Sequence, residues 1–153
     1  MISPHLTRPI GRARPPLPHD PQRYKLYKME REYIGTSIYH KASLKDLQMV
    51  ANHVCGKWKV PPIRVRRYSS KEKTFGYYEN KTNRIYLNAH RHGQNIGVLL
   101  HELAHHITDM RHLDAQDHGP EFCYVYACLL DRYRILPMEC FRLLADKWGV
   151  TVA

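Results

Sequence analysis

A predicted helix with two histidines four residues apart constrains this chain more than any other feature of its sequence. Residues 95–122 read NIGVLLHELAHHITDMRHLDAQDHGPEF and contain His101, Glu102 and His105 in the order H-E-x-x-H. On an α-helix, positions i and i+4 lie on one face, about a turn apart. Both imidazoles can therefore reach one zinc ion at about 2.0–2.1 Å. Glu102 can act as the general base on a water held by that ion.

The residues around this motif are mostly apolar, which predicts that the helix is buried. The apolar positions are Ile96, Val98, Leu99, Leu100, Leu103, Ala104 and Ile107. Buried histidines need polar partners, so this setting favours a metal site over two solvated surface histidines. A buried helix also holds its ligands rigidly. His106 follows His105 directly, so it lies about 100° further around the helix and points away from the metal.

A third ligand is expected, because catalytic zinc usually has three protein ligands and a water. The metzincin pattern would need Gly at position 108 and His at position 111, where this chain has Thr108 and Arg111. We favour His118, because the Gly119–Pro120 pair ends a polar loop and starts a new helix there. The other residues of suitable type in this segment remain alternatives: His112, Asp114, Asp117 and Glu121.

HELAHH followed by HGPEF resembles the zinc-binding core of SprT-like (Spartan-type) metallopeptidases and their WLM relatives. The resemblance is specific over residues 95–122 and extends over residues 43–148. In that family, the two motif histidines and the histidine of a downstream H-G-x-x-aromatic segment bind zinc, and the motif glutamate is catalytic. The resemblance therefore implies one zinc ion per chain, bound by His101, His105 and His118, with Glu102 as the catalytic base.

The same resemblance implies a fold and a reaction. The fold would be zincin-like and α+β, with a small antiparallel sheet of about three strands packed on the active-site helix and helices flanking it. The reaction would be peptide-bond hydrolysis, in which Glu102 takes a proton from the attacking water and delivers it to the leaving amine. An oxyanion donor is also expected. The residues available by type are Arg111, His112, Tyr78 and Tyr124.

Periodic patterns elsewhere predict the remaining elements. Ser43 is a good N-cap for a helix, and Pro61 and Pro62 prevent that helix from continuing. Residues 24–38 fit either a helix or a short strand with a turn at Gly35. Helices are predicted over residues 43–57, 121–134 and 138–148, and a meander of antiparallel strands over residues 63–68, 75–78 and 84–87.

The strand over residues 84–87 is a candidate sheet edge. In zinc peptidases an extended substrate usually lies along a strand edge above the metal helix, so the resemblance implies such an edge here. An exposed edge provides backbone hydrogen bonds without reading side chains. An ordinary interior strand is the alternative.

The length of 153 residues suits one domain with a sizeable core. We expect residues 1–22 to form a flexible, proline-rich basic arm and residues 23–153 to form the single domain. The arm is either a leader without a role or a tether to nucleic acid or a larger assembly. It has no apolar segment of the kind found in a secretory signal. We therefore expect a cytoplasmic or nucleoid-associated protein, or one associated with a phage or virion, and not a secreted one.

The formal net charge of +10 favours an anionic partner such as DNA. A solvated sheet face is the alternative explanation for the charged run near the first strand. Binding through such a surface would be electrostatic and strongly salt-dependent. No apolar run approaches the length of about 18 residues needed to span a membrane. The candidate nucleic-acid-binding residues are Arg64, Arg66, Arg67, Lys71 and Lys73.

Two classes of function fit the sequence. The first is a zinc endopeptidase acting on protein or peptide substrates, with DNA-associated proteins as one candidate class. The second is a non-proteolytic metal-binding protein on a zincin scaffold, such as a nucleic-acid-associated or virion component. Glu102 favours the enzyme, because a structural zinc site needs no general base and usually has four protein ligands. The four cysteines form no C-x-x-C pair and are expected to be reduced, buried thiols.

Overall fold

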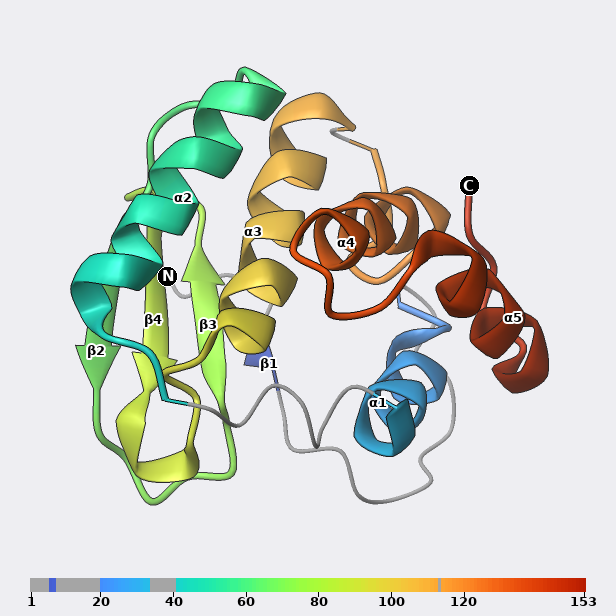
Figure 1. Cartoon of the computed structure of the whole chain (residues 1–153), viewed down its shortest axis with the longest axis horizontal. Helices are drawn as coiled ribbons and strands as arrows, with labels where there is room; N and C mark the ends of the chain where they lie inside the picture. The colour runs from blue at the N-terminus through green and yellow to red at the C-terminus, as the bar shows by residue number, and fades with distance from the viewer. Residues whose placement is uncertain (1–5, 8–19, 34–40, 113) are drawn as a thin grey trace.

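Helices and a small sheet form an α+β structure in the computed structural model (Figure 1). The structure describes residues 6–7, 20–33, 41–112 and 114–153. In chain order the elements are β1 (Leu6–Thr7), α1 (Arg23–Tyr33), α2 (Leu44–Trp58), β2 (Arg64–Tyr68), β3 (Gly76–Glu79), β4 (Arg84–Asn88), the short 3₁₀ helix η1 (Ala89–Arg91), α3 (Ile96–Arg111), α4 (Pro120–Arg132) and α5 (Met138–Trp148). Among these elements, no helix is long and apolar enough to cross a membrane.

The sheet is mixed, whereas the sequence predicted an antiparallel meander. Its strand order is β1-β3-β4-β2. β4 pairs antiparallel with β3 but parallel with β2. The chain leaving β2 passes the position of β4 and forms β3 first, and the β3–β4 hairpin then places β4 between β3 and β2. Asn88 fixes that passage: its side chain accepts a hydrogen bond from the Ser70 amide and donates to the carbonyl oxygens of Ser70 and Thr74.

This strand order also corrects the predicted substrate edge. β4 has neighbours on both sides, β3 and β2, so residues 84–87 form an interior strand and the alternative is confirmed. β3 is bordered by the two-residue strand β1. Among the described strands, β2 is the long strand that lies at an edge.

The first core helix forms where its capping residue predicted. The Ser43 hydroxyl accepts a hydrogen bond from the Asp46 amide and starts α2. Gln48, on α2, donates to the Ile63 carbonyl oxygen and accepts from the Val65 amide, which attaches the helix to β2. α2 and α3 therefore cover one face of the sheet (Figure 1).

α3 is buried between the sheet and α4 (Figure 1). It begins at Asn95, whose side chain accepts a hydrogen bond from the Val98 amide. On its sheet side, His106 contacts the Tyr78 hydroxyl at 3.0 Å and the Pro61 carbonyl oxygen at 2.7 Å. His106 thus points away from the side of the helix that carries His101 and His105, as its position in the motif predicted.

The N-terminal part of the chain contributes more to the folded body than predicted. The ambiguous segment over residues 24–38 is a helix, α1, over residues 23–33, and the predicted turn at Gly35 lies outside the described residues. Leu26 and Met29 of α1 are fully buried. Asp20 and Gln22, which fall in the predicted arm, are also buried. Residues 1–5 and 8–19 of that arm lie outside the described residues as well.

All four cysteines are free thiols. Cys55 and Cys123 are buried, Cys128 is half-buried and Cys140 is exposed. The expectation of reduced thiols is met, but burial holds for only part of the set.

Candidate metal centre

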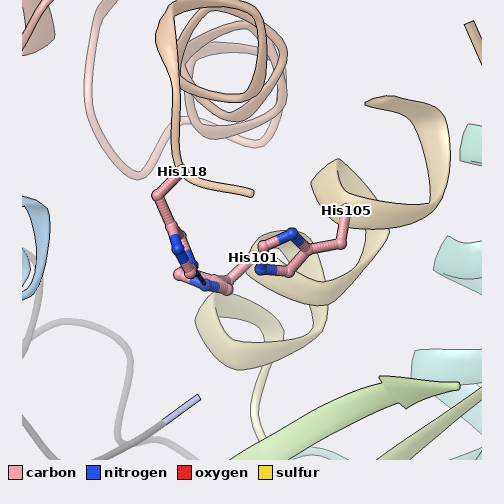
Figure 2. Close-up of side chains that lie close together, drawn as sticks. All are labelled: His101, His105 and His118. Atoms are coloured by element: carbon pink, nitrogen blue, oxygen red, sulfur yellow. Dashed lines mark hydrogen bonds between the residues drawn. The ribbon is translucent and has the colours of Figure 1, made fainter. Parts of the chain in front are cut away.

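Three imidazoles converge between α3 and α4. His101 and His105 project from one face of α3, and His118 reaches toward them from the loop that enters α4 (Figure 2). One ligand atom from each histidine lies within 4.8 Å of the others, and all three side chains are buried. The Nε2 atoms of His101 and His118 are 3.3 Å apart. The three ligands expected from the sequence therefore form one cluster that could hold a metal ion.

His118 is held in place by Asp20, a residue that no local sequence pattern connects to it. One carboxylate oxygen of Asp20 accepts a hydrogen bond from His118 Nδ1 at 2.7 Å, and the other accepts from the His118 amide at 3.1 Å. Gln22 donates to the His118 carbonyl oxygen at 3.0 Å and exchanges two hydrogen bonds with the Thr151 backbone. The loop that carries His118 is thus fixed by the segment just before α1.

His101 has a corresponding carboxylate partner on α1. Glu30 Oε1 lies 3.2 Å from His101 Nδ1. The other oxygen of Glu30 accepts a hydrogen bond from the Tyr126 hydroxyl of α4 at 3.4 Å. Glu30 is itself buried, so its charge acts on His101 with little screening by water.

These two carboxylate–histidine pairs determine how the imidazoles can act. The Asp20 carboxylate only accepts hydrogen bonds, so Nδ1 of His118 carries the proton and Nε2 of that ring presents a lone pair, whereas Glu30 lies beside His101 as an ion-pair partner at 3.2 Å. The Nε2 atoms of His101 and His118 face each other at 3.3 Å, so they can share either a proton donated by protonated His101 or a cation bound between them. Two nitrogens bound tetrahedrally to zinc are about 3.3–3.4 Å apart, from the usual Zn–N distance. Carboxylate partners of this kind accompany the histidine ligands of metal sites, so the residues fit a zinc ion.

The carboxylates and the burial shift the pKa values of the two histidines in opposite directions. Burial lowers the pKa of His101, but the charge of Glu30 and its hydrogen bond outweigh that effect, and Glu102 adds to it, so the pKa is raised above 6.5. Burial also lowers the pKa of His118, and there Asp20 offsets only part of the effect, so the pKa is below 6.5. His118 is thus kept neutral, the form that binds metal.

Aromatic rings pack around the cluster. The Phe122 ring centroid lies 4.4 Å from that of His105, 5.0 Å from that of His118 and 5.1 Å from that of His101. The Tyr27 ring of α1 meets His118 edge-on at 5.3 Å. These contacts restrict rotation of the imidazoles and surround the site with a medium of low polarity.

Glu102 is fully buried on α3, directly after His101. Its charge contributes to raising the pKa values of His101, Tyr27 and Tyr126, so its carboxylate lies within electrostatic range of the cluster. Within the described part of the chain, the group of metal-ligand side chains consists of the three histidines. The alternative third ligands His112, Asp114, Asp117 and Glu121 do not belong to it.

Two of the oxyanion donors suggested by residue type, Tyr78 and Arg111, have their contacts away from the three-histidine cluster. Tyr78 is bonded to His106 on the sheet side of α3. Arg111 donates to the Trp58 carbonyl oxygen and lies 5.6 Å from the Trp58 ring. His112 and Tyr124 are exposed. Asp20, Glu30 and Gln22, which contact His118 or Tyr126 in the structure, were not predicted, because these contacts join residues about a hundred positions apart.

The predicted nucleic-acid residues lie on and beside the sheet. Arg64 and Arg66 are exposed on β2, on the side opposite the buried Val65. Arg67 has the same parity as Val65 and belongs to the other side. Lys71 and Lys73 are exposed in the loop after β2.

No family model, curated protein or solved structure matches the chain. The likeness to SprT-like metallopeptidases therefore depends on the HELAHH and HGPEF segments and remains an expectation.

Proposed function

We propose that this chain is a zinc-dependent endopeptidase with His101, His105 and His118 as its metal ligands. The observation that carries the proposal is the pair of buried carboxylates, Asp20 and Glu30, that orient His118 and His101 so that their Nε2 atoms are 3.3 Å apart. Buried carboxylates on two of three clustered imidazoles are typical of metal sites. Three protein ligands leave a coordination position free, as catalytic zinc requires.

Glu102 carries the proton in the proposed reaction. A bound zinc ion supplies Lewis acidity to the attacking water and to the scissile carbonyl. The Glu102 carboxylate accepts a proton from that water and transfers it to the leaving amine. Its position supports this role, because Glu102 directly follows His101 on α3 and its charge acts on the His101 imidazole. The apolar rings around the cluster keep competing water from the reacting groups.

A structural metal site is the second candidate. It is favoured by the burial of the three histidines, each no more than 2% exposed, and of Glu102, which is 0% exposed. A peptide must reach the cluster to be hydrolysed, whereas a structural ion needs no access. In that case the metal would hold α1, α3 and α4 together, and Glu102 would have no role in chemistry.

Metal content and peptide cleavage, measured together, separate these functions. The proteins to compare are the wild type, Glu102→Gln and His118→Ala, with Glu121→Gln as a control that changes a carboxylate outside the cluster. We expect one zinc per chain in all except His118→Ala. Cleavage of casein and of a mixed peptide library should occur with the wild type and the control alone.

Other outcomes would change the assignment. Zinc binding without cleavage by the wild type would support the structural site. Cleavage at the wild-type rate by Glu102→Gln would exclude Glu102 as the base. Absence of zinc from the wild type after reconstitution would refute the metal site itself.

A further inference from the structure

The sheet has a second face that carries aromatic and cationic side chains together. The inner face of the sheet packs on α2 and α3 and carries buried residues of every long strand, such as Val65, Tyr78 and Ile85. Side chains alternate between the faces along a strand. The opposite face, which we call the outer sheet face, therefore carries three tyrosines and three arginines. These residues are Arg64, Arg66, Tyr68, Tyr77, Arg84 and Tyr86.

The three tyrosine rings form a row in the order Tyr86, Tyr77, Tyr68, which differs from the order of their strands in the sheet. Tyr77 of β3 and Tyr86 of β4 are direct cross-strand neighbours, and their rings stack with centroids 4.8 Å apart and an interplanar angle of 20°. Tyr68 of β2 continues the row, with its ring centroid 5.5 Å from that of Tyr77. All three side chains are half-buried, so each is held by its neighbours and still presents ring surface to solvent.

The arginines lie beside this row. Arg66 is the cross-strand neighbour of Tyr86, and Arg64 is the neighbour of Arg84. All three guanidinium groups belong to exposed residues, and Arg84 lies 3.5 Å from the Tyr86 hydroxyl. The described acidic residue on the same face, Glu79, accepts a hydrogen bond from Thr82. The face is therefore net positive.

The loop after β2 carries two lysines and one glutamate (Lys71, Lys73 and Glu72), and so adds a net positive charge beyond one end of the tyrosine row. Lys71 and Lys73 are exposed on this loop. Asn88 holds the loop through three hydrogen bonds, to the amide and carbonyl of Ser70 and to the carbonyl of Thr74. The lysines thus stand at a fixed distance from Tyr68, which directly precedes the loop.

We propose that the outer sheet face binds single-stranded nucleic acid, with bases stacked on the tyrosines and phosphates paired with the arginines and the loop lysines. Aromatic rings beside cations are how proteins bind single strands without reading sequence. A duplex is disfavoured as the ligand, because its bases are already stacked on one another and offer no free face to the tyrosine rings. An acidic protein surface would pair with the arginines but would not need the rings.

The geometry sets the expected size of the effects. Removing a tyrosine that stacks on a base should weaken binding by about 5-fold to 150-fold. Each arginine that pairs with a phosphate contributes about 0.7 to the slope of log K against log salt for a single strand. Arg64, Arg66 and Arg84 together predict a slope of about −2, and removing one of them should reduce its magnitude by about 0.7.

The test is fluorescence anisotropy with the full zinc-loaded chain and labelled 12-mers: single-stranded dT, single-stranded rU and a DNA duplex. The variants are Tyr86→Ala, Tyr86→Phe and Arg66→Ala. Tyr124→Ala and Arg132→Ala are matched controls, because both residues are exposed on α4. Zinc content and thermal unfolding establish that each variant is folded. Should Tyr86→Ala unfold, Tyr86→Phe and Arg66→Ala still test the face without opening the core.

We expect the wild type to bind a single strand more tightly than the duplex. Tyr86→Ala and Arg66→Ala should bind the single strand more weakly, Tyr86→Phe should bind it nearly as tightly as the wild type, and the two control variants should be unchanged. The tighter of the two single strands identifies DNA or RNA. Equal binding of the duplex with no effect of Tyr86→Ala would overturn the proposal, and so would no binding at low salt. Binding is measured without cleavage, so this inference and the peptidase proposal can fail separately.

Discussion

Replacing Asp20 by asparagine should weaken zinc binding although Asp20 does not belong to the ligand cluster. Asp20 accepts two hydrogen bonds from His118, one from Nδ1 at 2.7 Å and one from the backbone amide at 3.1 Å. Asparagine has the same shape but one oxygen and one NH₂ group. If the oxygen keeps the backbone bond, the NH₂ group faces Nδ1 and the ring proton moves to Nε2. That proton occupies the lone pair that binds the metal.

The size of the effect follows from the role of such partners. Changing a residue that orients a metal ligand usually costs 10-fold to 100-fold in affinity, which corresponds to about 1.4–2.7 kcal/mol. We expect Asp20→Asn near the upper end, because its contact with Nδ1 is short and buried. Glu30→Gln should cost less, because the corresponding contact with His101 is 3.2 Å long.

Competition with a chromogenic chelator measures these affinities directly. Asp146→Asn is the matched control, because Asp146 is exposed on α5. Circular dichroism should establish that the variants remain folded at the temperature used. A zinc affinity of Asp20→Asn within threefold of the wild type, with zinc binding abolished in His118→Ala, would refute the reasoning that Asp20 acts through the tautomer of His118.

Three further predictions follow. Zinc at 1,000 times its dissociation constant should stabilise the wild type by about 4 kcal/mol, or about 10 °C in Tm for a chain of this length. The Tm of His118→Ala should not change, and an equal shift in both proteins would mean that the ion binds at another site. Zinc affinity should fall about tenfold per unit as the pH drops below the raised pKa of His101, because a proton then occupies its ligand position, whereas His118, with a lowered pKa, stays neutral. Isothermal titration calorimetry in two buffers should detect about one proton released on binding at a pH below that pKa, and a pH-independent affinity would contradict this. Burial raises the pKa of Cys55 to about 11, so about a thousandth of the Cys55 side chains are thiolate at pH 8. Mass spectrometry should therefore find the exposed Cys140 alkylated before Cys55, and the reverse order would contradict the burial of Cys55.

The parts of the structure that sequence predicted are those determined by neighbouring residues. The H-E-x-x-H spacing depends only on the period of a helix, so His101 and His105 were predicted to lie on one face and His106 on another. Ser43 identified the start of α2 because an N-cap bonds to an amide three residues later. Gly119 and Pro120 identified the start of α4 for a similar local reason.

What sequence could not predict depends on contacts between distant segments. Alternation of apolar and polar residues is the same in parallel and antiparallel strands, so it could not show that β2 lies parallel to β4. The pairing of Asp20 with His118 and of Glu30 with His101 leaves no local pattern either. Tyr78 has the chemistry of an oxyanion donor, but its contact with His106 places it on the sheet side of α3.

The bonds of Gln22 have a consequence for when the candidate metal centre can assemble during synthesis of the chain. Gln22 joins the backbone of His118 to that of Thr151, and the Ala153 amide donates to the Pro120 carbonyl oxygen at the start of α4. Segments about 130 residues apart in the sequence thus enclose the same ligand loop. We expect the three-histidine centre to assemble during synthesis only after Thr151 and Ala153 have left the ribosome, so that shorter nascent chains hold no assembled centre.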